Sequence, residues 1–179
     1  MADVPLHIVL VAPEIAGNTG NIIRLCANVG ATLHLVEPLG FDFEDRKLRR
    51  AGLDYHDLAN VRVHSDWPTC RAQLPTDRTF AYTSHATIRY CDAPPLAGDA
   101  LVFGAEGTGL APEVLASFGP EARRTIPMRP GNRSINLANA VAIVAFDAWR
   151  QLGFDGAGPS GTRRVRPGSE PDTADPTFR

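Results

Sequence analysis

Short apolar runs alternate along the chain with stretches of helical spacing. His7–Ala12 is almost continuously apolar, as in a strand that is buried on both faces of a sheet. Four later runs predict further strands: Leu33–Val36, Thr79–Thr83, Ala100–Phe103 and Arg124–Ile126. Because these runs alternate with helical stretches, the pattern predicts an α/β fold with a mainly parallel sheet.

Two helices stand out between and after these strands. Asn21–Val29 places its apolar residues at helical spacing, and Gly30 follows where a helix C-cap glycine belongs. Asn136–Leu152 is apolar nearly all round in its first half. A helix of that kind is buried, either in the core or against a partner subunit.

The composition changes after Gly156. From there to Thr177 glycine, proline, serine and threonine dominate, and Val165 is the only aliphatic residue larger than alanine. Such a segment buries too little apolar surface to offset the entropy of ordering it. We therefore expect one domain over residues 1–156 and a flexible tail over 157–179. Its arginines, Arg163, Arg164 and Arg166, are either RNA contacts or part of a solvated extension.

Composition narrows the class of protein. The chain has 179 residues, 44% hydrophobic and 21% charged, which suits one compact domain. No apolar run approaches the roughly 20 residues of a membrane-spanning helix, and the N-terminus lacks the pattern of a signal peptide. The net charge of −2 excludes a uniformly basic nucleic-acid-binding protein. The widely separated Cys26, Cys70 and Cys91 form no metal-binding or disulfide pattern, so we expect buried thiols, a cytoplasmic location and no metal.

Three segments that follow predicted strands carry the candidate chemistry, because the carboxyl ends of parallel strands form the ligand crevice. In the first, Pro13–Arg24, Gly17 and Gly20 allow a tight backbone path, and Asn18 is a candidate helix N-cap. Free N–H groups behind such a cap favour an anion, and Arg24 can point back toward the crevice. The alternative is a plain turn and cap with a surface arginine.

The second segment, Phe103–Leu110, has three glycines in six residues, which leaves room for a ligand against the backbone. It matches neither a phosphate-binding loop nor a dinucleotide fingerprint. Glu106 is a candidate partner for a ribose, an ammonium group or an arginine. The alternative is a plain turn.

The third segment joins Ile126–Met128 to Ser134–Ala140. Ser134 or Asn136 can cap the following helix, and Ser134 can instead donate to a carboxylate or a reacting ribose. Asn139 lies in an apolar turn, where we expect its amide to need hydrogen-bond partners.

Together these segments resemble the SPOUT class of RNA methyltransferases. The resemblance is carried by Asn18–Arg24, Phe103–Leu110, Ile126–Met128 and Ser134–Ala140, in matching order and separation. Two more stretches, Glu37–Phe41 and Arg49–His56, bring it closest to the TrmL type. That branch methylates the ribose 2′-hydroxyl of the wobble nucleotide, a cytidine or modified uridine, in leucine tRNAs. The resemblance covers about Leu6 to Gly156.

The resemblance implies a fold and partners that the pattern does not show. It implies helices on both faces of the sheet, a C-terminal trefoil knot, S-adenosylmethionine as cofactor and tRNA as substrate. It also implies a homodimer whose active site lies near the subunit interface. One departure is Thr108, which stands where some relatives carry arginine.

The resemblance also assigns roles by position. It makes the catalytic residues Arg24, Asn18, Glu106, Ser134 and Asn139. It makes the cofactor pocket Tyr82, Thr83, Gly104, Glu106, Gly109, Ile126, Met128 and Ser134, with the main chain at Gly104, Ile126 and Met128 reading the adenine edge. An arginine is normally protonated, so we expect Arg24 to stabilise negative charge on the reacting oxygen rather than to remove its proton.

Contact with RNA is a separate prediction, placed on a basic cluster and the polar residues after it: Arg46, Arg49, Arg50, Tyr55 and His56. The alternative is a solvated helix face paired with Asp42, Glu44 and Asp45. Competing functions are the same chemistry on another tRNA position or on ribosomal RNA, a non-catalytic RNA-binding protein, and a generic nucleotide-binding domain.

Overall fold

The computed structural model describes residues 5–42, 60–132 and 134–158. Within them six strands form one sheet: β1 (Leu6–Val11), β2 (Thr32–Val36), β3 (Val61–His64), β4 (Thr79–Tyr82), β5 (Asp99–Phe103) and β6 (Arg123–Arg124). The helices are α1 (Ala16–Val29), α4 (Trp67–Gln73), α5 (Pro112–Ala116) and α6 (Leu137–Gln151), with a 3₁₀ turn at Pro120–Ala122.

The sheet order is β3-β2-β1-β5-β4-β6, and every pair of neighbours is parallel. This confirms the predicted α/β fold with a mainly parallel sheet. The sequence did not indicate β3, because this strand at the sheet edge is no apolar run: Arg62 and Val63 are exposed, and only His64 is buried. The last strand is Arg123–Arg124, earlier than the predicted Arg124–Ile126.

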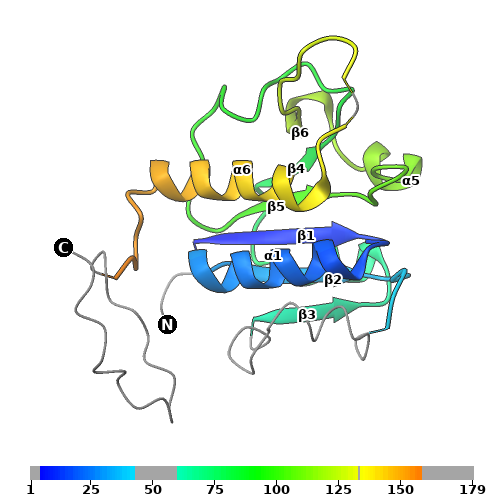
Figure 1. Ribbon diagram of the computed structural model, residues 1–179, viewed down its shortest axis with the longest axis horizontal. Coiled ribbons are helices and arrows are strands. Elements are labelled where there is room, and N and C mark those ends of the chain that lie inside the picture. Colours follow the sequence, from blue (N-terminus) through cyan, green and yellow to red (C-terminus); the bar gives the residue numbers. More distant parts are fainter. Residues whose placement is uncertain (1–4, 43–59, 133, 159–179) are drawn as a thin grey trace, which may run out of the picture.

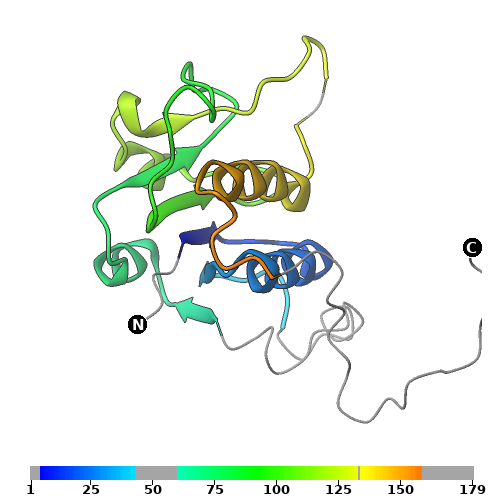
Figure 2. The ribbon, with the colours of Figure 1, turned by 90° about the vertical axis from the view of Figure 1, so that its left-hand side faces the viewer.

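Helices cover both faces of the sheet, as the resemblance implied. Helices α1 and α6 lie side by side on one face (Figure 1). Turned by 90°, α4 is seen on the opposite side of the sheet (Figure 2). Each layer has its own core, one built around Ile8, Leu33 and Val141 and the other around Val9, Val102 and Cys70. The trefoil knot stays a prediction.

Both expected helices are present, but α1 starts earlier than predicted. It begins at Ala16 rather than Asn21, so Gly17 and Gly20 lie inside the helix and the expected tight turn there is wrong. Gly30 ends it in the left-handed conformation, at φ 73°, as predicted. The Asn136 side chain caps α6 by accepting from the Ala138 and Asn139 N–H groups.

The described chain ends at residue 158, so the predicted tail and its arginines lie almost wholly outside it, and the domain limits 1–156 and 157–179 stay a prediction. No helix in the described ranges is both long and apolar enough to cross a membrane.

Candidate functional site

A cavity of about 470 Å³ opens at the carboxyl ends of β4 and β5, beside the start of α6. This volume is typical of small-molecule sites, roughly 300–1,000 Å³. Every residue predicted for the cofactor pocket lines it: Tyr82, Thr83, Gly104, Glu106, Gly109, Ile126, Met128 and Ser134. The structure thus brings the second and third predicted segments together around one hollow, and the roles of these residues stay predictions.

The cavity combines an aromatic and apolar wall with a polar side. The Tyr82 and Phe103 rings, from neighbouring strands, stack with centroids 4.6 Å apart and planes 14° apart. Burial raises the pKa of the Tyr82 hydroxyl, so that group stays neutral. Leu110 and Leu137 extend the apolar surface, and Thr83, Glu106 and Ser134 supply polar atoms. Such a lining suits a flat heterocycle that carries polar groups at its edge.

The loop after β5 is closed on itself. Ala105 and Gly109 exchange two backbone hydrogen bonds, of 3.1 and 2.9 Å. A Cβ atom on Gly104 would overlap the backbone of Gly109 and Leu110, and Gly109 has a φ of 72°. The lack of a side chain at Gly104 therefore lets the loop close. The space beside Gly104 was expected to take a ligand, and that expectation is wrong because the loop's own backbone fills it.

Glu106 caps α1 from this loop. Its carboxylate accepts from the Glu14 N–H at 2.7 Å, the Ile15 N–H at 3.3 Å and the Asn18 amide at 2.9 Å. The N-cap residue Ile15 has no side-chain cap of its own, so Glu106 supplies the negative charge that a helix N-terminus favours. The prediction that Asn18 is the N-cap is wrong, because Asn18 lies buried inside the first turn.

Two further contacts join all three predicted segments into one network. Glu14 returns the contact by accepting from the Gly107 N–H at 3.1 Å. The Asn136 amide donates to the Asn18 side-chain oxygen at 3.0 Å, which ties α6 to α1. A Cβ atom on Gly40 would lie 2.7 Å from the Glu14 Cα, so the Glu37–Phe41 stretch packs directly behind this network.

Two of the predicted catalytic residues lie elsewhere. In the described part of the chain, Arg24 and Asn139 are exposed, on α1 and α6, and neither lines the cavity. Asn139 is exposed, so water can supply the hydrogen-bond partners that its amide was expected to need. The structure of one chain therefore brings together Asn18, Glu106 and Ser134 at or beside the cavity, and leaves Arg24 and Asn139 on the surface.

Residues 5–146 match the SpoU rRNA Methylase family. The chain belongs to that family. A relative from Burkholderia pseudomallei (strain 1106a), named tRNA (cytidine(34)-2′-O)-methyltransferase, is 57% identical over 152 residues, which is 84% of this chain and 97% of the relative. A protein of the same name from Methylovorus glucosotrophus (strain SIP3-4) is 53% identical over 150 residues, with the same coverage. The predicted resemblance is confirmed.

Solved structures of SpoU-type methyltransferases share the fold. One that addresses the 2-OH methylation of C/U34 on tRNA is 43% identical, with a TM-score of 0.75, over 83% of this chain and 91% of that chain. An AdoMet-bound rRNA methyltransferase from Sinorhizobium meliloti is 26% identical, with a TM-score of 0.71, over 82% of this chain and 56% of that chain.

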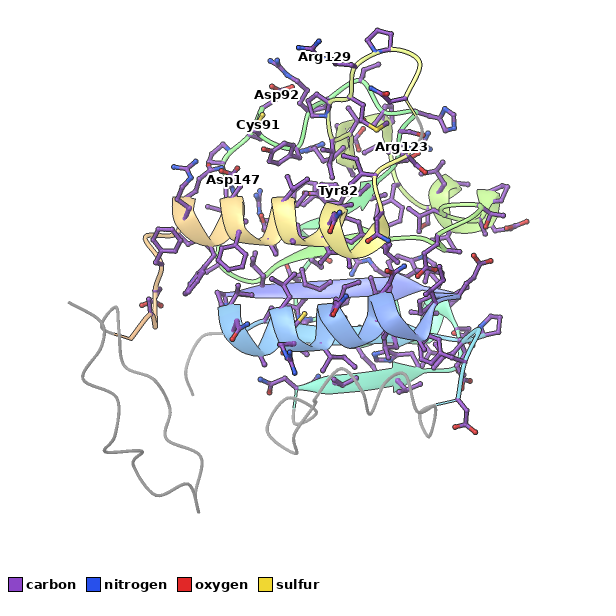
Figure 3. All side chains as sticks on the ribbon, viewed as in Figure 1. Tyr82, Cys91, Asp92, Arg123, Arg129 and Asp147 are labelled. Atoms are coloured by element: carbon purple, nitrogen blue, oxygen red, sulfur yellow. The ribbon has the colours of Figure 1, made fainter. Side chains whose placement is uncertain are left out.

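The residues predicted to contact RNA in this SpoU family member, Arg46, Arg49, Arg50, Tyr55 and His56, lie outside the described residues. Within the described residues, Arg129 directly follows the cavity residue Met128 and offers another cation. Arg129 is exposed on the loop between β6 and α6, which stands away from the sheet (Figure 3). Thr108, the departure from some relatives, is exposed and lines the cavity.

The sequence analysis missed several lining residues: Ser84, His85, Thr125 and Leu137. The signal that finds them is their place directly after a strand or at the start of α6, since the carboxyl edge of a parallel sheet gathers such positions.

Proposed function

We propose that this chain is an S-adenosylmethionine-dependent methyltransferase that modifies the ribose 2′-hydroxyl of the tRNA wobble nucleotide. The nucleotide is a cytidine or modified uridine, and the substrates are leucine tRNAs in the cytoplasm. The names of the relatives above half identity support the reaction. The observation that carries the proposal for this chain is the cavity, which every predicted cofactor position lines.

The cavity suits the cofactor chemically. Its aromatic and apolar wall fits an adenine ring, and the main chain at Gly104, Ile126 and Met128 offers donors and acceptors for the ring edge. Thr83 and Ser134 can bind the polar ends of the molecule. When bound, S-adenosylmethionine supplies a methyl group that its sulfonium already activates.

A second copy of the chain completes the site. Arg24 is exposed on α1, and the neighbouring α6 exposes Ile143 and Phe146 at 39% and 44%. Ile143 and Phe146 are three residues apart on the helix, so they lie on one face of α6, and we assign that face to the subunit contact. A homodimer through α1 and α6 buries them and lets Arg24 of one subunit reach the nucleotide held against the partner's cavity.

The positive charge of Arg24 suits it to stabilise the reacting oxygen rather than to remove its proton. Methyl transfer forms a bond from the ribose oxygen to the methyl carbon, breaks the carbon–sulfur bond and releases the hydroxyl proton to solvent. The oxygen gains negative charge as its proton leaves. A protonated guanidinium beside the oxygen stabilises that charge. Glu106 and Asn18 hold the start of α1, the helix that carries Arg24.

RNA binding rests on arginines outside the cavity. In this proposal Arg46, Arg49 and Arg50 contact phosphates, and Tyr55 and His56 contact exposed bases. Thr108 stands where some relatives carry arginine, and Arg129 or Arg133 would supply that positive charge instead. Reversing the charge of Arg49 and Arg50 should weaken tRNA affinity and flatten its salt dependence, measured by filter binding at several salt concentrations.

The test of the proposed function is incubation of the purified chain with bulk tRNA and isotopically labelled S-adenosylmethionine, followed by nucleoside mass spectrometry. We expect label in 2′-O-methylated cytidine or uridine at position 34 of leucine tRNAs. Label at another tRNA position, or in ribosomal RNA added as a competitor, would show that the proposed substrate is wrong and that the proposed reaction is right. Cofactor binding without methyl transfer to any RNA would favour the non-catalytic alternative.

A further inference from the structure

Three buried histidines lie in a row across the opposite half of the sheet. His7, His34 and His64, on β1, β2 and β3, are exposed at only 5%, 0% and 4%. His7 Nδ1 lies 3.1 Å from His34 Nε2, and His34 Nδ1 lies 2.9 Å from His64 Nε2. Neutral imidazoles satisfy such a chain when each ring donates one hydrogen bond and accepts another.

Cys70 faces the end of this row from α4. It is fully buried, and its Sγ atom, one ring nitrogen of His34 and one ring nitrogen of His64 all lie within 4.8 Å of one another. The cavity lining includes none of these residues. The cluster is thus a set of donor atoms on three different elements that the proposed methyl transfer does not use.

Each neutral imidazole keeps one ring nitrogen unprotonated, with a lone pair that can bind a metal ion. If His34 directs an unprotonated Nδ1 toward Cys70, its Nε2 carries the proton and donates to His7. That arrangement is the outer hydrogen bond that a metal-bound histidine usually makes.

We propose that His34 Nδ1, His64 Nε2 and Cys70 Sγ bind a zinc(II) ion that joins β2 and β3 to α4. Two imidazoles and one thiolate are ligands that zinc prefers, with water in the fourth position. In tetrahedral geometry the two nitrogens stand about 3.3 Å apart, so the observed 2.9 Å needs only a small opening. The thiol proton passes to solvent as the ion binds.

Charge does not oppose the ion strongly. Arg62 stands opposite His34 in the strand register, but it is exposed, so water screens its charge. The Cys70 thiolate offsets one unit of the ion's charge. Because the ligands come from two strands and a helix, the ion would stabilise the folded edge of the sheet rather than take part in methyl transfer.

The test uses the full chain after treatment with a chelator. Titration with cobalt(II), a coloured substitute for zinc, should saturate at one ion per chain and give a thiolate-to-cobalt charge-transfer band. Zinc(II) should displace the cobalt and raise the thermal unfolding midpoint. Cys70→Ser should abolish the band, while Cys26→Ser should keep it, because Cys26 is equally buried on the other face of the sheet. His7→Asn should weaken the ion's affinity about 10–100-fold.

A cobalt titration of the wild-type chain without the charge-transfer band would overturn the proposal, whether or not the variants fold. So would a band that Cys70→Ser retains. In either case the histidines would form a metal-free hydrogen-bonded row.

Discussion

The cavity beside β4 and β5 and the histidine cluster beneath α4 both gather polar side chains, but the chain builds them differently. The cavity draws on loops at the carboxyl edge of the sheet, and most of its polar residues are exposed or half-buried. The cluster draws on strands β1, β2 and β3 and on helix α4, and it is buried. Loops at a strand end can vary their polar groups freely, whereas polar groups inside a strand need partners on neighbouring strands.

The largest expected effect is a loss of methyl transfer when the arginine that α1 contributes to the proposed site is removed. Arg24→Ala removes the proposed charge stabiliser, which is not among the residues that line the cavity. We expect methyl transfer to fall at least about 100-fold, the usual loss for such a group, while S-adenosylmethionine affinity by calorimetry changes less than about threefold.

Arg71→Ala is the matched control, since Arg71 lies on α4, on the opposite side of the sheet from α1 (Figure 2), and contacts only its own neighbourhood: the Thr76 carbonyl at 3.1 Å and Asp77 at 3.5 Å. It should methylate tRNA at the wild-type rate. Turnover by Arg24→Ala within a few-fold of wild type would remove Arg24 from the catalytic role.

The second prediction compares Gly104, which the loop after β5 needs in order to close, with Gly17, which helix α1 does not need. Gly104→Ala forces a Cβ atom into the loop backbone, so we expect a loss of about 1–3 kcal/mol of stability and weaker cofactor binding. Gly17→Ala places a Cβ atom where nothing lies within 4 Å, inside α1, and should gain up to about 1 kcal/mol. Urea unfolding of both variants measures the difference, and equal effects would contradict the account of the loop.

The sequence predicted most of the strands, but not the contacts between residues that are distant along the chain. Apolar runs were enough to predict β1, β2, β4 and β5, and the resemblance to a known family supplied the predicted cavity residues. The start of α1 was predicted too late, because its cap is Glu106, a residue close in space and distant in sequence. The histidine cluster escaped notice for the same reason, since strand register, which no spacing in the sequence displays, brings His34 and His64 together.

Glu106→Gln tests whether that distant cap holds α1 in place. The substitution removes the charge and turns an amide donor toward groups that are themselves donors. We expect a loss of about 1–2 kcal/mol, measured by urea unfolding. Glu113→Gln, in the first turn of α5, should change stability by less than about 0.5 kcal/mol. A Glu106→Gln effect as small as that would mean that the cap does not stabilise α1.

Phe146→Glu separates assembly from folding and should have the smallest effect on the chain itself. The ring is 44% exposed on α6, so a charge there leaves the monomer core intact but opposes burial in a dimer. Sedimentation should show a dissociation constant of the dimer raised about 10-fold or more, which is a loss of roughly 1.4 kcal/mol in the free energy of association. Val63→Glu, 49% exposed on the edge strand β3, should leave the association unchanged.

The central claim, that Arg24 of one subunit serves the cavity of the other, is tested most directly by mixing two inactive chains. One carries Arg24→Ala; the other carries Ala140→Trp, which fills the cavity that Ala140 lines. Co-expressed, they should recover about a quarter of wild-type methyl transfer, because half of the dimers are mixed and each of these has one intact site. No recovery in isolated mixed dimers would contradict the claim, since a site built within one chain leaves both sites of every mixed dimer inactive.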